Sequence, residues 1–115
     1  MDPVSIEEAI RTCANRIAKG VKVCHDAYTA YLDADRMYDR AYAQAYMQHD
    51  GPAHEKKYAA ELATGAERAL RDQKDAEYKY TDRTAKAIEA ELRALQSVGA
   101  SVRQMYGVAG RGEGA

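Results

Sequence analysis

The stretch His49-Asp50-Gly51-Pro52-Ala53-His54 separates two long helical patterns and holds the only strong helix-breaking signal in the interior of the chain. Gly51 can close a helix with a left-handed backbone, and Pro52 suits the first turn of the next helix. Two helices joined by so short a connection usually fold back antiparallel. We therefore predict a turn over residues 49–52, formed by Asp50, Gly51 and Pro52, that joins two helices into a hairpin.

The residues before the turn carry a heptad repeat, which predicts a first helix over residues 6–48. Uncharged residues recur there at alternating spacings of four and three, the pattern of a coiled-coil seam. Residues 1–5 form a lead-in, and Ser5 with Glu8 forms a capping box at the helix start. Gly20 lies in the seam and marks either a bend or a close approach of another backbone. The seam consists of Ile6, Ile10, Cys13, Ile17, Gly20, Cys24, Ala27, Tyr31, Ala34, Tyr38, Ala41 and Ala45.

The residues after the turn carry a second repeat, which predicts a helix over residues 53–106. Its apolar positions form two stretches that are out of phase, with a slip between Tyr80 and Ala85 of the kind that locally unwinds a supercoil. We expect the helix to end at Gly107 and the Gly-rich residues 107–115 to form a flexible tail. The first stretch is Ala59, Leu62, Ala66, Ala69, Gln73, Ala76 and Tyr80. The second stretch is Ala85, Ile88, Leu92, Leu95, Gly99, Val102 and Tyr106.

A hairpin closed tightly at Gly51 pairs positions whose numbers sum to roughly 102. This register places Ile6 beside Leu95 and Ile10 beside Leu92, so the aliphatic ends of the two helices meet. Such a hairpin buries only one stripe of each helix, and large flanking side chains stay partly uncovered. Those side chains are Val21, Tyr28, Tyr42, Tyr46 and Tyr58.

Side-by-side association of two hairpins would cover the flanking side chains. The predicted fold is therefore all-α: a long antiparallel coiled-coil hairpin over residues 6–106 that forms a homodimer, an elongated four-helix bundle. The expected core and interface comprise Ile6, Ile10, Ile17, Cys24, Tyr31, Tyr38, Tyr42, Leu62, Ile88, Leu92, Leu95, Val102 and Tyr106.

Composition narrows the choice of fold and partner. The 115 residues suffice for one domain, and with nine tyrosines but no Phe or Trp the chain buries little apolar area per residue. Charged residues make up 30% and the net charge is −1, without the basic excess of a nucleic-acid or membrane surface. No apolar run approaches the ~20 residues that span a bilayer, and the start lacks a signal-peptide pattern. A cytoplasmic location without membrane attachment is expected.

Residues that could support ligand binding or catalysis are few. His49, Asp50, His54 and Glu55 gather at the turn, and zinc or nickel accepts such ligands. A polar turn with histidines near helix ends is the simpler interpretation. The serines near the end of the second helix have no histidine nearby in the hairpin, and the Gly-rich end lacks the Lys-Ser/Thr of a phosphate loop. We expect no metal, no cofactor and no enzymatic activity.

Two surfaces could bind a partner. Five tyrosines of the first helix could stack on single-stranded nucleic acid, with Lys22, Arg36 and Arg40 contacting phosphates. Nucleic acid is not favoured, because aromatics at heptad spacing usually form core and the aspartates at positions 33, 35 and 39 offset the arginines. The tyrosines are Tyr28, Tyr31, Tyr38, Tyr42 and Tyr46. The longer second helix should project past the first. Its projecting end is a candidate partner surface, unless packing within the dimer covers it. This surface comprises Val98, Val102, Met105 and Tyr106.

The second half of the chain carries Ala94-Leu95-Gln96-Ser97 and then Ser101-Val102-Arg103 after an Ala/Glu/Arg-rich helix. Over roughly residues 55–106 it resembles small, mostly uncharacterised coiled-coil proteins of actinobacterial bacteriophages. The resemblance implies a location in the host cytoplasm and a partner in phage DNA metabolism, and it assigns no functional residue. We expect a non-enzymatic protein–protein interaction or scaffolding module that binds an unidentified protein. The alternative is an accessory single-stranded nucleic-acid-binding protein in phage recombination or replication.

Overall fold

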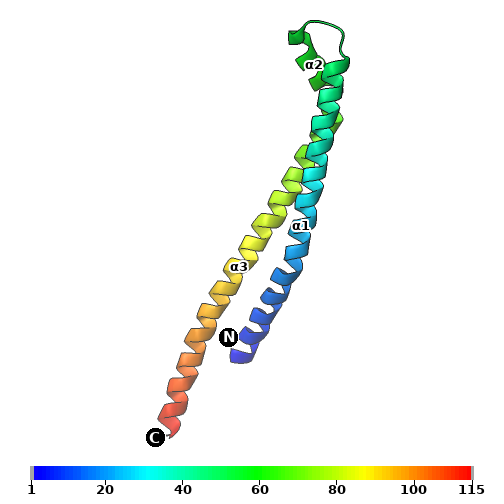
Figure 1. Cartoon of the computed structure of the whole chain (residues 1–115). Helices are drawn as coiled ribbons and strands as arrows, with labels where there is room; N and C mark the ends of the chain where they lie inside the picture. The colour runs from blue at the N-terminus through cyan, green and yellow to red at the C-terminus, as the bar shows by residue number, and fades with distance from the viewer. Residues whose placement is uncertain (1, 115) are drawn as a thin grey trace. The chain divides into compact units, whose positions relative to one another are not determined.

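The computed structural model describes the backbone of residues 2–114 and the side chains of residues 2–107. It is all-helical, with no strand among the described residues. The helices are α1 (Pro3–Gln48), α2 (Ala53–Ala63) and α3 (Gly65–Gly114) (Figure 1). Contacts divide the chain into two units, each described by itself: unit 1 comprises Met1–Lys22 and Arg83–Ala115, and unit 2 comprises Val23–Asp82.

Helix α1 begins at Pro3, so the predicted lead-in over residues 1–5 and the Ser5–Glu8 capping box are wrong. Asp2 caps the helix instead, because its Oδ1 accepts a hydrogen bond from the Ser5 backbone N–H at 2.8 Å. Pro3 occupies the first helical position, where an N–H would lack a helical partner and its absence costs nothing. Asp followed by Pro is therefore the start signal in this chain.

Titration of Asp2 should be visible at the start of α1. Hydrogen bonds from Ser5 lower the pKa of Asp2 below its ordinary 3.8, so the cap strengthens the helix above pH 3.8 and weakens as the pH falls through the lowered pKa. We expect the NMR shift of the Ser5 amide proton to titrate with a midpoint below 3.8. Asp2→Asn keeps the cap without the charge and should abolish this titration. A wild-type midpoint at or above 3.8 would contradict the assignment.

The connection between α1 and α2 lies where the sequence places it: α1 ends at Gln48 and α2 begins at Ala53. The left-handed backbone expected at Gly51 is wrong, since no described glycine has a positive φ. Gly51 provides space instead, because a Cβ there would lie 2.6 Å from Glu55 Oε2 and 3.0 Å from His49 Nε2.

Every seam position predicted in the first helix is buried or half-buried in α1. The close approach of another backbone expected at Gly20 is wrong, because a Cβ added there would meet nothing within 4 Å. Helix α1 is continuous through Gly20, and the alternative of a bend at this residue stays a prediction.

Replacing Gly20 by alanine should raise the free energy of unfolding by about 1 kcal/mol, the difference in helix propensity between the two residues. The matched variant is Gly99→Ala in the same unit. Its Cβ would lie 3.2 Å from Ile6 Cγ2 and 3.7 Å from Ile10 Cδ1, so crowding should cancel the gain. Urea denaturation followed by circular dichroism measures both variants. A Gly99→Ala protein that is stabilised more than Gly20→Ala would contradict the packing.

The second helix begins at Ala53 as predicted, but it differs from the prediction by an internal break and by its C-terminal end. It is divided at Thr64, whose Oγ1 donates a hydrogen bond to the Ala60 carbonyl oxygen at 2.6 Å. Such a bond to the preceding turn often bends a helix. Helix α3 then runs to Gly114, so the expected helix end at Tyr106 is wrong. Helix α3 includes the backbone of residues 107–114, and the flexibility expected of this Gly-rich segment stays a prediction.

The slip predicted between Tyr80 and Ala85 is wrong, because the covered positions of α2 and α3 follow one unbroken heptad repeat. We call this set of buried and half-buried residues the inner seam. It consists of Ala60, Thr64, Glu67, Arg71, Lys74, Tyr78, Thr81, Ala85, Ile88, Leu92, Leu95, Gly99 and Val102. The apolar stretch expected to be buried before Tyr80 is exposed from Leu62 onward, with Leu62 87% and Tyr80 72% exposed.

In unit 1, the start of α1 packs antiparallel against α3. Ile6 is 1% exposed and faces Gly99, and Arg16 contacts Glu91 further along α1 at 3.4 Å. Cys13 and Ile88 complete the buried apolar set of this unit. The predicted pairing of Ile6 with Leu95 is wrong by about one helical turn.

In unit 2, α1 packs antiparallel against α2 and the start of α3. Lys56 lies over the Tyr46 ring, as the predicted register requires near the turn. Beyond Thr64, Arg71 reaches Asp35, a contact about one helical turn later than predicted. The register therefore shifts within the segment that contains the break at Thr64, which the sequence pattern did not reveal.

Candidate interaction surfaces

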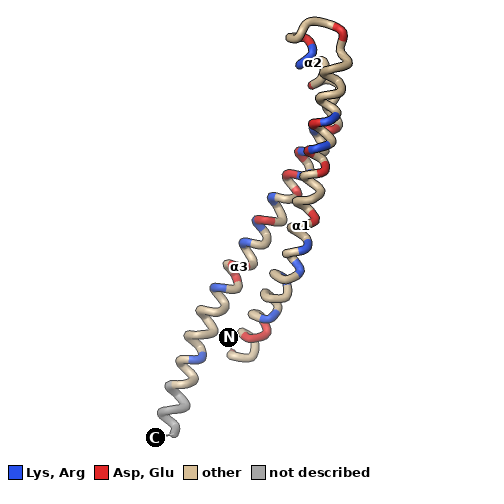
Figure 2. Tube along the Cα trace, in the orientation of Figure 1, with Lys and Arg blue, Asp and Glu red and all other residues tan. Residues whose placement is uncertain are grey.

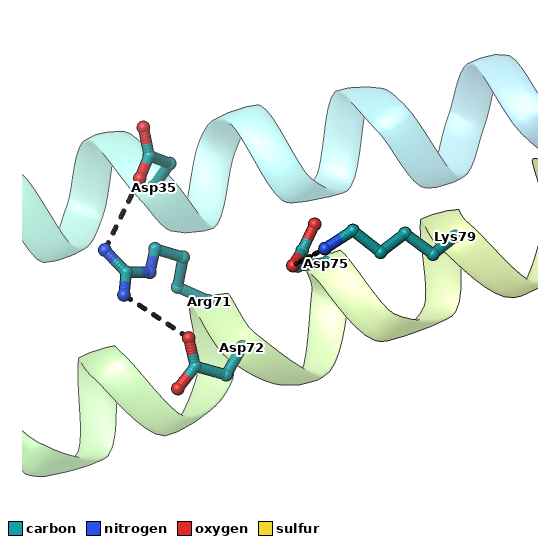
Figure 3. Close-up of polar contacts among 5 residues, drawn as sticks. All are labelled: Asp35, Arg71, Asp72, Asp75 and Lys79. Carbon is teal, nitrogen blue, oxygen red and sulfur yellow. Dashed lines mark hydrogen bonds and ion pairs between the residues drawn. The ribbon is translucent and has the colours of Figure 1, made fainter.

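The contact between α1 and α3 in unit 2 is built on Arg71 (Figure 3). Its guanidinium lies 4.5 Å from the centre of the Tyr38 ring. One nitrogen is 3.9 Å from Asp35 Oδ1 and the other is 3.3 Å from Asp72 Oδ1. Burial opposes the charge, but the hydrogen bond to Asp72 and the negative charges nearby raise the pKa of Arg71 overall. Arg71 therefore stays charged and ties the two helices together through one planar group.

The ion pairs within α3 are local. Lys79 Nζ lies 2.8 Å from Asp75 Oδ2 one turn away (Figure 3). Lys74 Nζ lies 3.2 Å from Glu77 Oε2. Acidic and basic residues both occur along α1 and along α3 (Figure 2). Such exposed pairs stabilise a helix by a few tenths of a kcal/mol at most and do not form a binding site.

An open groove runs along α1 in unit 2 and is closed at one side by Glu67 of α3. The Oε2 atom of Glu67 is buried and has no hydrogen-bond partner among the described residues. Arg36 lines the same groove and pairs with Asp33 at 3.3 Å. The remaining lining residues are Met37, Arg40, Ala41 and Gln44. The groove is shallow, and its one unusual feature is the unsatisfied carboxylate.

The tyrosines considered for nucleic-acid stacking mainly contact one another and α3. Tyr28 meets Tyr78 of α3 with ring centres 5.0 Å apart, and Tyr38 meets Tyr42 at 6.1 Å. Tyr42 and Tyr46 follow at 6.4 Å. All of these residues on α1 except Tyr28 are at least half-buried. This arrangement provides packing between helices rather than an open row of rings.

The polar residues at the turn form one pair. His49 Nε2 and Glu55 Oε2 lie 3.4 Å apart. No group of three or more His, Cys, Asp or Glu residues that could hold a metal ion occurs in the described part of the chain. Cys13 and Cys24 are both free thiols, and burial raises the pKa of the Cys13 thiol.

The candidate partner surface at the end of α3 in unit 1 is largely uncovered. Val98 is 45% exposed, Met105 69% and Tyr106 60%, whereas Val102 is half-buried and belongs to the inner seam. Tyr106 therefore does not belong to the core of the single chain, and neither does Leu62.

A second uncovered apolar surface lies on unit 2, and we call it the outer stripe. Its residues recur with heptad spacing on the side of α2 and α3 opposite the inner seam. The sequence pattern reveals the same residues except Leu70, but it places them on the buried side of the helix. The outer stripe consists of Ala59, Leu62, Ala66, Ala69, Leu70, Gln73, Ala76 and Tyr80, all exposed except the half-buried Ala59.

Comparisons of this chain with protein families, with curated proteins and with solved structures find no match. Within the described residues, no helix has both the length and the apolar character needed to cross a membrane.

Proposed function

We propose that this chain is a non-enzymatic protein–protein interaction or scaffolding module built on one antiparallel coiled-coil hairpin. Two observations support the hairpin. In each unit taken alone, a segment of α1 packs antiparallel against α3. The same two continuous helices supply both units, and the turn at Asp50, Gly51 and Pro52 precedes the second of them.

The observation that carries the interaction function is the exposure of large apolar side chains on outer helix faces. In unit 1, Val98 and Met105 lie one heptad apart on α3 and are exposed, and Tyr106 lies beside Met105. Isolated apolar residues are common on surfaces, but a row at helical spacing is typical of a face that binds another helix. The polar clusters of the chain, in contrast, are ion pairs that stabilise its own helices.

The resemblance of residues 55–106 to small phage proteins directs the search for a partner. We propose a phage-type module that acts in the host cytoplasm and binds a protein of phage DNA metabolism. Self-association into a homodimer belongs to the same proposal.

The test is affinity capture from an actinobacterial lysate with the immobilised full chain as bait. A specific partner should be retained by the wild type and lost with Val98→Glu combined with Met105→Glu. The matched control combines Gln96→Glu with Gln104→Glu, which adds the same charge at exposed positions of the same helix. The same proteins captured by all three baits would contradict a partner at this surface.

The alternative function is binding of single-stranded nucleic acid, and the packing of the tyrosine rings argues against it. We expect no mobility shift of a labelled single-stranded oligonucleotide at low salt. A shift that weakens steeply as salt rises, and weakens further with Arg36→Gln and Arg40→Gln, would favour the alternative instead.

A further inference from the structure

The outer stripe is an apolar face that the packing of unit 2 leaves uncovered. The inner seam of α2 and α3 faces α1 in unit 2, and the outer stripe lies on the opposite side of the same helices. Leu62 is 87% exposed, Leu70 37% and Tyr80 72%. Apart from Leu70, the stripe keeps alternating spacings of three and four, without a charge. It runs from Ala59 in α2 across the break at Thr64 to Tyr80 in α3, about 32 Å along the helix axes. A surface of this periodicity fits another helix lying along it.

We infer that the outer stripe binds the same stripe of a second copy, antiparallel, about a two-fold axis near Ala69. This inference deepens the proposed function, because it assigns the surface and the geometry of self-association. It also replaces the bundle expected from the sequence with a back-to-back arrangement, in which α3 of one copy packs against α3 of the other.

The sizes of the side chains favour the antiparallel direction. Two large residues, Leu62 and Tyr80, stand near the two ends of the stripe. Between them lie three alanines, with Leu70 and Gln73 near the middle. In an antiparallel pair, Leu62 lies against the turn that carries Ala76 in the second copy, and Tyr80 lies against the turn that carries Ala59. In a parallel pair, identical residues meet, so the large ones would hold the helices apart at the alanine positions. Large side chains opposite small ones allow close packing along the whole stripe.

The charges beside the stripe favour the same direction. In a parallel pair, Asp72 of each copy would lie against Glu77 of the other on both sides of the interface. In the antiparallel pair, Asp72 lies near Gly65 and Lys79 lies near Tyr58, whose ring attracts a cation. The like-charge contact of Asp72 with Glu77 therefore disfavours the parallel pair. The antiparallel pair has no like-charge contact at these positions, so the charges select one orientation.

The first experiment measures mass by light scattering. We expect the wild type to have twice the 12.7 kDa of one chain. Ala69→Glu places two carboxylates together at the two-fold axis and should give the mass of one chain. Because Ala69 is exposed in the single chain, its circular dichroism should not change. Ala90→Glu is the control, since Ala90 is an exposed alanine at the same heptad position of α3 in unit 1. A monomeric wild type, or a dimer that survives Ala69→Glu, would overturn the inference.

The second experiment tests the direction with spin labels. A Cys13→Ala, Cys24→Ala background receives one cysteine, either at Lys57 or at Arg68, both exposed in unit 2. In the antiparallel dimer, labels at Lys57 should be about 35 Å apart along the helices, whereas labels at Arg68 should be close together. Short distances for both positions would mean a parallel dimer and would refute the proposed geometry. The capture experiment with the Val98 and Met105 variant tests a partner surface on unit 1, whereas the dimer experiments test the outer stripe on unit 2. The partner proposal and the dimer geometry can therefore fail separately.

Discussion

Ile6→Ala should lower the free energy of unfolding by about 2–5 kcal/mol, the largest effect expected of any single substitution in this chain. Ile6 is 1% exposed and is the only large side chain among the described residues that is fully buried. Its Cγ2 lies beside the backbone of Gly99. Truncation of Ile6 would leave a cavity there, and Gly99 has no Cβ that could fill it. Thermal and urea denaturation followed by circular dichroism would measure the loss.

Val4→Ala is the matched control for this prediction. Val4 lies two residues before Ile6 on the same turn of α1 and is 64% exposed, so its truncation should change the stability by less than about 0.5 kcal/mol. Because Ile6 belongs to unit 1, hydrogen exchange should show that α1 and α3 amides of that unit open first in the variant. Equal stability of Ile6→Ala and Val4→Ala would mean that α1 and α3 do not pack as described.

The first helix could be predicted closely because its seam obeys one rule. Each of its seam positions is uncharged, and the flanking positions carry most of the charges, so apolar periodicity and burial coincide. The start of α1 was missed for a different reason. A Ser–Glu capping box and an Asp–Pro start lie three residues apart, and only the coordinates show which backbone N–H is capped.

The buried side of the second helix could not be predicted, because in unit 2 the buried positions are not the most apolar ones. The inner seam there carries Glu67, Arg71 and Lys74, while alanines and Leu62 lie outside. Long charged side chains can cover a neighbouring helix with their aliphatic stems and place the charge at the edge of the contact. Arg71 instead covers the Tyr38 ring with its guanidinium, which is 4.5 Å from the ring centre. A search for apolar periodicity therefore selects the outer stripe, which is exposed in unit 2.

The register was predicted correctly only near the turn. Residues close to Gly51 pair as a tight hairpin requires, and Lys56 over Tyr46 is an example. The hydrogen bond from Thr64 to Ala60 lies at an irregularity in the second helix, beyond which the pairing is displaced by about one turn. Threonine is common inside helices, so its presence alone does not signal a break.

Glu67→Leu should raise the free energy of unfolding by about 1–3 kcal/mol, the second largest expected effect. Oε2 of Glu67 is buried without a hydrogen-bond partner among the described residues, and a buried polar atom in this state costs about that much. Leucine at this inner-seam position removes the unsatisfied atom and adds apolar contact with Ala41 and Met37, which line the same groove. Urea denaturation at neutral pH would measure the gain.

Glu77→Leu distinguishes this effect from a general benefit of leucine in α3. Glu77 is exposed and accepts hydrogen bonds from Lys74 at 3.2 Å and from Gln73 at 3.2 Å. These bonds lower the pKa of Glu77, so its carboxylate favours the folded chain above its ordinary pKa and loses this effect as the pH falls. Its replacement should therefore give no gain at neutral pH. The contrary result is stabilisation by Glu77→Leu but not by Glu67→Leu. It would show that the Glu67 carboxylate finds a hydrogen-bond partner in solution. The groove that Glu67 lines, rather than the outer stripe, would then be the first surface to test for a ligand.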